Sequence, residues 1–137
     1  MYNEDLDLWI ARSLLKHLDA NKGSLYMYLE QDLDKRDTSK QWIEIRYDGP
    51  ETVQLNKNVT RSSIDVDIFI NCPAEEDLFV LERLKGKVKK MLTCFDVLND
   101  DGEVVFTLWP SDPKVLDYGR VDESRSAAAI SCRYTEK

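Results

Sequence analysis

The sequence is short of the residues that most catalytic and metal sites need. It contains a single histidine, His17, and its five glycines form neither Gly-x-Gly-x-x-Gly nor Gly-x-x-x-x-Gly-Lys. No serine or cysteine nucleophile is matched to His17, so the sequence does not indicate a catalytic triad. One histidine is also too few for a histidine metal cluster. His17 is better explained as an ordinary residue near the end of a helix. These absences predict a protein without catalytic residues, metal or cofactor.

Cysteines and long apolar runs are scarce as well. The three cysteines, Cys72, Cys94 and Cys132, are far apart and form no Cys-x-x-Cys pair. Neither a zinc site nor a disulfide framework is indicated, and we expect buried or partly buried reduced thiols. No apolar run approaches the ~20 residues that a membrane span needs. The first residues lack the basic region of a signal peptide, so we expect synthesis in the cytoplasm and no membrane partner.

Basic residues are outnumbered by acidic ones. The chain has 19 Lys and Arg against 26 Asp and Glu, a formal net charge of -7. A nucleic-acid clamp needs a net basic face, so this charge argues against sequence-specific DNA binding. The hydrophobic fraction of 42% is ordinary for a globular protein, and 137 residues suit one domain, residues 1–137.

The stretch from Ser63 to Phe95 carries the clearest structural pattern. Its first half alternates with the two-residue period of a half-buried strand, whose apolar face is formed by Ile64, Val66, Ile68 and Ile70. In its second half, apolar residues recur every three or four positions, which predicts an amphipathic helix with Pro73 at its first position. A strand followed by a helix that packs back on the sheet is therefore expected.

Similar patterns predict the remaining elements. A first helix is expected to start near Asn3 or Asp5 and to stop at Gly23. Further strands are expected at Ser24–Leu29, Gln41–Asp48, Glu51–Val59, Glu103–Trp109 and Ser126–Tyr134. The turn signal Asp48-Gly49-Pro50 makes a hairpin of the second and third of these. The fold class is α+β, a mostly antiparallel sheet of about five to six strands with both helices packed on it.

Two carboxylates on one strand are the sharpest candidate for chemistry. Asp65 and Asp67 project from the same side of the predicted strand, and such a pair can hold divalent metal ions. The run Ser-Ile-Asp-Val-Asp-Ile is similar to the metal strand of nucleotidyltransferases of the polymerase-beta type, and Glu103 would be the third carboxylate. The Gly-Ser element that this family carries before the strand is missing. The simpler interpretation places both aspartates on the solvent-exposed face of a sheet whose other face is covered.

Aromatic residues and two polar segments point to an interface. Trp42, Phe69 and Trp109 are predicted on the polar side or at the end of strands, where they would be covered by a partner or by another part of the same subunit. Gln31–Lys40 and Ser111–Arg125 are predicted to be polar loops that become ordered when a partner protein docks. The candidate interface residues are Trp42, Asp65, Asp67, Phe69, Trp109, Asp112, Lys114, Asp117, Tyr118 and Arg120.

The order of these elements resembles the tail-terminator or tail-completion proteins of long-tailed bacteriophages. The resemblance covers most of the chain. It starts with the Leu-Trp-Ile stripe of the first helix and includes Trp42–Tyr47 and Ser63–Ile68. A mid-chain helix, a strand and a long polar segment follow, and Ala127–Tyr134 resembles the closing strand of the family.

This resemblance implies a non-enzymatic virion protein that assembles into a ring, usually of six subunits. The ring would sit at the head-proximal end of the tail and join the tail tube protein to a head-completion or connector protein. DNA would pass through its lumen without being gripped, which suits the acidic balance. Two alternatives stay open: a metal-dependent nucleotidyltransferase-like enzyme that uses Asp65 and Asp67, and an acidic protein-binding module.

Overall fold

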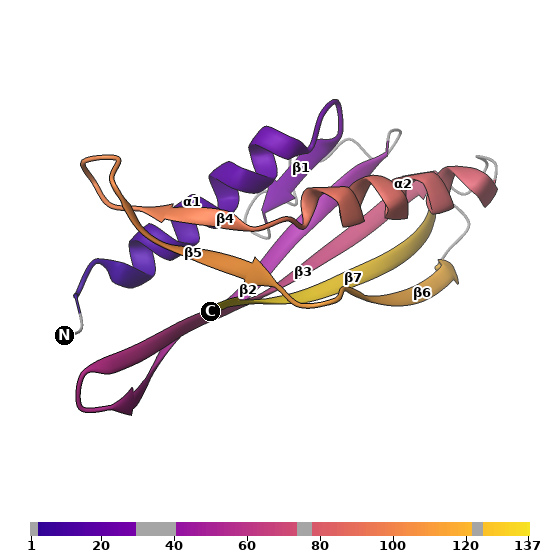
Figure 1. Ribbon diagram of the computed structural model, residues 1–137. Helices are drawn as coiled ribbons and strands as arrows, with labels where there is room; N and C mark the ends of the chain where they lie inside the picture. Colours follow the sequence, from indigo (N-terminus) through magenta and orange to yellow (C-terminus); the bar gives the residue numbers. More distant parts are fainter. Residues whose placement is uncertain (1–2, 30–40, 74–77, 122–124) are drawn as a thin grey trace.

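The chain folds as two helices against one face of a curled, mixed sheet (Figure 1). The computed structural model describes residues 3–29, 41–73, 78–121 and 125–137. In chain order the elements are α1 Leu6–Asn21, β1 Tyr26–Leu29, β2 Trp42–Asn56, β3 Val59–Pro73, α2 Leu78–Met91, β4 Phe95–Leu98, β5 Val104–Pro110, β6 Lys114–Arg120 and β7 Arg125–Glu136. The α+β prediction, with an N-terminal and a mid-chain helix, is therefore confirmed. No helix in the described part of the chain is long and apolar enough to cross a membrane.

The seven strands pair in the order β1-β2-β3-β7-β5-β4, and β6 also pairs with β7. All of these pairs are antiparallel except β1 with β2, which makes the sheet mixed. β5 and β6 follow each other along the same edge of β7: β5 pairs with Tyr134–Glu136, and β6 pairs with residues 126–131. The chain between β5 and β6 is thereby held against β7.

The core lies between the helices and the sheet. Ile10, Leu14 and Leu18 of α1 follow one another at helical spacing and are fully buried. They join α2 residues and the apolar face of β3 in one cluster, together with Ile64, Val66, Ile68 and Ile70. Burying an Ile or Leu side chain stabilises a fold by about 1.5–3 kcal/mol, so this cluster fixes which face of the sheet is covered. The predicted helical stripes and the predicted buried face of β3 are confirmed, but the predicted bounds of the second helix are wrong, because Pro73 ends β3 and Phe95 begins β4.

The β2–β3 hairpin is longer than the sequence predicted. Each strand has 15 residues, and the chain continues through Gly49-Pro50, a cis peptide bond, without turning. Gly49 has a φ of +97°, which glycine adopts easily, and the strand is bulged between Asp48 and Glu51. Pairing resumes with Glu51 opposite Ser63. The prediction of a turn at Asp48-Gly49-Pro50 is therefore wrong. These residues form a bulge within a continuous strand instead.

The real turn of this hairpin is at residues 57–58, between β2 and β3. Asn56 Oδ1 accepts a hydrogen bond from the backbone N–H of Asn58 at 2.9 Å, a common way for asparagine to close a tight turn. We call the part of the hairpin beyond the bulge, residues 51–62, the arm. Figure 1 shows that the arm projects beyond the rest of the sheet.

The segment Ser111–Arg125, predicted to be a polar loop, contains the strand β6 over Lys114–Arg120. Val115 and Tyr118 favour strands, and β5 leaves most of the β7 edge open for pairing. The prediction of a loop was wrong because the strand forms by pairing with residues far away in the sequence, and no local pattern indicates that pairing. The other predicted loop, Gln31–Lys40, lies outside the described residues.

Candidate functional site

The face of the sheet turned away from the helices carries polar side chains in rows that cross the strands. Residues paired on neighbouring strands point to the same face, so the register places them side by side. One row consists of Arg46, Asp67, Ser131 and Lys114, from β2, β3, β7 and β6 in turn. The row next to it consists of Asp48, Asp65 and Arg133. We call this surface the polar face.

The two rows surround a hollow of about 740 Å³ on the polar face. Its charged lining residues are Asp48, Asp65, Asp67, Asp112, Lys114 and Arg133. Four carboxylates against two cations give this polar hollow a formal charge of -2. Four residues that the sequence predicted for an interface are thus brought together from two strands and a connection, namely Asp65, Asp67, Asp112 and Lys114.

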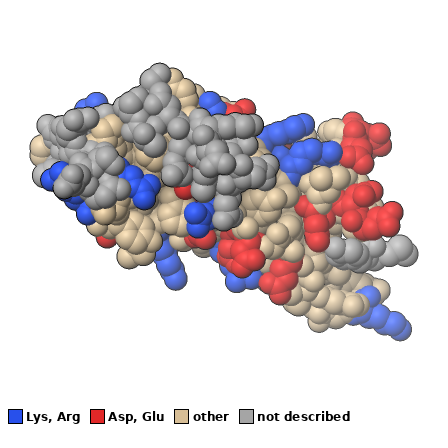
Figure 2. All heavy atoms as spheres, turned by 180° about the vertical axis from the view of Figure 1, so that it is seen from behind, with Lys and Arg blue, Asp and Glu red and all other residues tan. Residues whose placement is uncertain are grey.

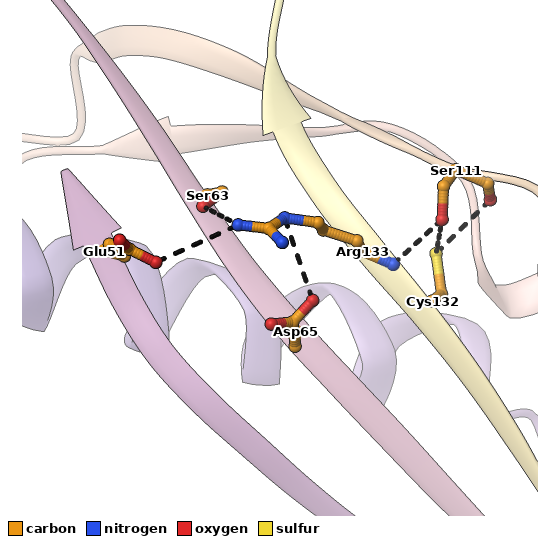
Figure 3. A network of polar contacts seen from close by, with 6 residues as sticks. All are labelled: Glu51, Ser63, Asp65, Ser111, Cys132 and Arg133. Atoms are coloured by element: carbon orange, nitrogen blue, oxygen red, sulfur yellow. Dashed lines mark hydrogen bonds and ion pairs between the residues drawn. The ribbon is translucent and has the colours of Figure 1, made fainter. Parts of the chain in front are cut away.

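Arg133 ties the polar hollow to the base of the arm (Figure 3). Its guanidinium reaches across β3, and Nη2 donates a hydrogen bond to Ser63 Oγ at 3.2 Å. Nη2 is also 3.9 Å from Glu51 Oε2, and Nε is 3.9 Å from Asp65 Oδ1. One cation therefore serves two carboxylates on two strands, in a position that is more than half exposed, where such pairs contribute little stability. The contact orients the side chains at the rim of the hollow.

Ser111 holds the connection between β5 and β6 against β7 (Figure 3). Its backbone N–H donates to the carbonyl of Arg133 at 2.8 Å, and its Oγ accepts from the Arg133 N–H at 3.0 Å. The Cys132 thiol donates to the Ser111 carbonyl at 3.5 Å. Burial raises the pKa of Cys132, so this thiol stays protonated at neutral pH. The three contacts fix Ser111 beside the hollow, and Asp112 and Lys114 follow directly after it.

Asp65 and Asp67 do not form a metal site with a third carboxylate. Asp67 Oδ1 accepts a hydrogen bond from Ser131 Oγ at 2.6 Å, and Asp65 pairs with Arg133 as described. Glu103 lies in the turn before β5, where its backbone N–H donates to Asn99 Oδ1 at 2.9 Å. No group of three or more His, Cys, Asp and Glu side chains among the described residues is placed to hold a metal ion. The prediction that Glu103 completes the aspartate pair is therefore wrong.

The three predicted interface aromatics have different surroundings. Trp42 is 1% exposed, and its indole N–H donates to Glu44 Oε1 at 3.0 Å, so it is not available to a partner. Of the two surroundings predicted for this ring, Trp42 has cover within its own subunit, and Glu44, two residues along the same face, satisfies its polar atom. Phe69 is half-buried, with the Arg46 guanidinium 4.8 Å from its ring centroid. Trp109 is 41% exposed and has Lys137 Nζ 4.6 Å from its ring centroid.

The last three predicted interface residues lie along β6, away from the hollow. Asp117 pairs with Ala128 in the register and so points to the helix side, where its Oδ1 is 2.5 Å from Lys85 Nζ of α2. Tyr118 is exposed at a bulge, and Arg120 is exposed near the end of the strand. Sequence reasoning missed Lys85, because no local pattern shows that its partner Asp117 lies on β6. Lys85 is buried and joins α2 to β6.

A second cavity of about 550 Å³ lies between α1 and the β4 strand, and its lining includes Arg12, His17 and Cys94. His17 Nε2 donates to the carbonyl of Met91 at 3.1 Å, and its ring stacks on Phe95 with centroids 5.5 Å apart. Burial lowers the pKa of His17, which keeps the ring neutral. His17 is thus a packing residue between α1 and the end of α2. Cys94 is exposed, contrary to expectation, whereas Cys72 and Cys132 are buried as predicted.

The polar hollow is the larger of these two cavities and the one that gathers predicted interface residues. It contains no histidine, since His17 lies on the other side of the sheet with the helices. Its mixed charges are suited to contact a charged surface of another molecule. Comparison of the sequence with protein-family models and with curated proteins found no match.

Proposed function

We propose that this chain is a virion assembly protein, a tail terminator that forms a ring at the head-proximal end of a phage tail. The ring joins the tail tube to the head connector, and the subunit acts without enzymatic chemistry. The order of elements that resembles this family of phage proteins supports the proposal. The single observation that carries it is the arm, because an arm that reaches beyond its own subunit is suited to bind a neighbour.

The arm has three apolar side chains that the described part of the chain leaves about half exposed. Val53, Leu55 and Val59 are 46%, 51% and 45% exposed. A two-stranded ribbon is marginally stable by itself, and it gains most by packing its side chains against another surface. When the surface that receives an arm differs from the arm itself, the contact is head-to-tail, and repeated contacts of this kind form a ring when the rotation between neighbours closes and an open filament when it does not. A ring is what a tail terminator needs.

The charge of the molecule suits a ring through which DNA passes. The net charge is -7, and in Figure 2 the Asp and Glu side chains gather in several clusters toward the end from which the arm extends. DNA is repelled by such a surface, so it would slide through the lumen without being bound.

An acidic protein-binding module is the second candidate, and the polar hollow with its formal charge of -2 favours it. Such a module would form a tight one-to-one complex with a basic partner. The nucleotidyltransferase alternative lacks this kind of support. Asp65 and Asp67 have Arg133 and Ser131 as partners, and among the described residues no third carboxylate is placed to hold a metal ion with them.

Light scattering over a concentration series, with and without magnesium, tests the proposed function. We expect the mass to rise with concentration toward a closed ring, and negatively stained particles to show a central hole. A strict monomer at every concentration would contradict self-assembly and favour the binding module. A magnesium-dependent nucleotide transfer activity would contradict the non-enzymatic role.

A further inference from the structure

The arm and the polar hollow carry opposite charges. The arm includes Lys57 and Arg61 and one acidic residue, Glu51 at its base, so its formal charge is +1 in a chain whose net charge is -7. In the part of the chain that the structure describes, neither Lys57 nor Arg61 forms an ion pair. The polar hollow has the reverse character, with a formal charge of -2. Two of its carboxylates, Asp48 and Asp112, are exposed and form no ion pair with any described residue.

The tip of the arm cannot reach the hollow of its own subunit. β2 and β3 run straight from the hollow into the arm: Asp48 pairs with Asp65 at the rim, Glu51 with Ser63 next, and Val53 with Arg61 beyond. Six residues of strand from Glu51 to the turn extend about 20 Å outward. Figure 1 shows the arm pointing away from the sheet. Lys57 at the tip can therefore meet a polar hollow only in another molecule, whereas Arg61, nearer the base, lines a pocket beside the hollow of its own subunit with Ser111 and Arg133.

We propose that the arm of one copy docks in the polar hollow of a second copy. Lys57 and Arg61 then face Asp48 and Asp112, which gives each unpaired charge a partner. The inference rests on the proposed self-assembly and names the contact that produces it.

Apolar groups are available on both sides of this contact. Leu116 of β6 is 57% exposed and pairs with Ala129, in the row of the polar face next to that of Lys114. It offers the exposed valines and leucine of the arm an apolar neighbour beside the charged hollow. The centre of an interface is usually apolar and its rim charged, and this arrangement provides both.

The contact is head-to-tail, since arm and hollow are different surfaces of the subunit. Antiparallel pairing of β6 with β6 of a second copy is a weaker alternative. Centred on Asp117, it would place Lys114 opposite Arg120, and like charges directly opposite each other destabilise a strand pair. Docking of the arm in the polar hollow therefore explains this face better than pairing of β6 with β6 does.

A charge-swap experiment tests the inference by light scattering and sedimentation at low salt. One variant carries Lys57→Glu and Arg61→Glu, and a second carries Asp48→Lys and Asp112→Lys. Each should raise the dissociation constant for self-association by roughly tenfold or more, because like charges would then meet at the contact. An equimolar mixture of the two variants should associate again, since each arm then faces a hollow of opposite charge. Added salt should weaken both the wild-type and the mixed assembly.

The matched control is Lys87→Glu with Lys89→Glu on the exposed side of α2, which changes the net charge by the same amount as the arm variant. It should associate like the wild type. A wild-type assembly that both charge variants leave unchanged would overturn the docking inference while the proposed ring stands. A wild-type chain that stays monomeric throughout would overturn both. Variants that dissociate without recovering in the mixture would overturn the pairing of arm with hollow.

Discussion

At the scale of single residues, the ionisation of His17 is coupled to folding in the pH range below neutral. Its Nε2–H donates to the Met91 carbonyl, and Nδ1 accepts a hydrogen bond from Asn21 Nδ2 at 3.3 Å. The contact with Asn21 needs the neutral ring, because a protonated Nδ1 would no longer accept, whereas the contact with Met91 is possible in both forms and raises the pKa. Burial is the main reason that the pKa of His17 lies below its ordinary value of 6.5.

We predict that stability falls as the pH drops below 6.5, because the unfolded chain then binds a proton that folded His17 does not. The fall ends once the pH is below the pKa of folded His17. His17→Gln should cost about 1–2 kcal/mol at neutral pH, from lost ring packing and hydrogen bonding. Urea unfolding of both proteins over a pH series measures this, and their difference should narrow on acidification. NMR titration of the single histidine at or above 6.5 would contradict the prediction.

At the scale of elements, β6 depends on contacts that lie far away in the sequence. It pairs with β7 alone among the described strands, and Lys85 of α2 is the side chain that reaches it from the helix layer. Lys85 Nζ is 2.5 Å from Asp117 Oδ1 and 2.6 Å from Glu82 Oε1. The hydrogen bond to Asp117 is the main reason that the pKa of Lys85 is raised above 10.5. This stabilisation is therefore present below pH 10.5 and is lost as the pH rises through the pKa of folded Lys85.

Replacing Lys85 by Met should loosen β6 more than it destabilises the whole protein. The methionine keeps the buried stem, and the carboxylates of Asp117 and Glu82 are more than half exposed and so remain hydrated. We expect a cost of about 1 kcal/mol in unfolding free energy. Hydrogen exchange of the β6 amides should become faster than in the exposed control Lys87→Met. Unchanged exchange in β6 would show that β7 holds this strand without help from α2.

The elements that the sequence could predict are those with one buried face. The alternation of Ile64, Val66, Ile68 and Ile70 located β3 because the helices cover that side of the sheet. β6 was missed because all of its residues are exposed, so no alternation marks it. The position of the hairpin turn was missed because Gly49 lies in a bulge. Whether such residues form a turn or a bulge depends on the pairing with the partner strand. The parallel direction of β1 depends in the same way on its partner.

The candidate site was predictable to the extent that it lies on the same alternating strand. Asp65 and Asp67 were placed on the polar side by the period of β3 alone. Asp112 joins them only because Ser111, two strands away in the sheet, is hydrogen-bonded to Arg133. Trp42 was placed on the correct face, but a period of two does not give the burial on that face, which the structure shows to be nearly complete.

At the scale of the whole molecule, the arm is the part that the fold of one subunit does not explain. Thr52 and Ser62 are the last pair before its exposed part, with their hydroxyl oxygens 2.9 Å apart. Beyond them the arm buries few apolar side chains in its own subunit. A feature that adds little to the stability of the monomer is best understood through contacts outside it.

Shortening the arm separates folding from assembly. Replacing residues 53–61 by Asn-Gly, which favours a two-residue hairpin turn, would close the strands directly between Thr52 and Ser62. We predict a change in unfolding free energy of less than about 1 kcal/mol, because the removed side chains are largely exposed, together with loss of self-association in light scattering. A companion variant with Val53→Thr and Leu55→Thr keeps the strands and the cations, and it should weaken assembly without abolishing it. A shortened chain that unfolds would show that the arm belongs to the fold, and one that assembles like the wild type would place the subunit contact elsewhere.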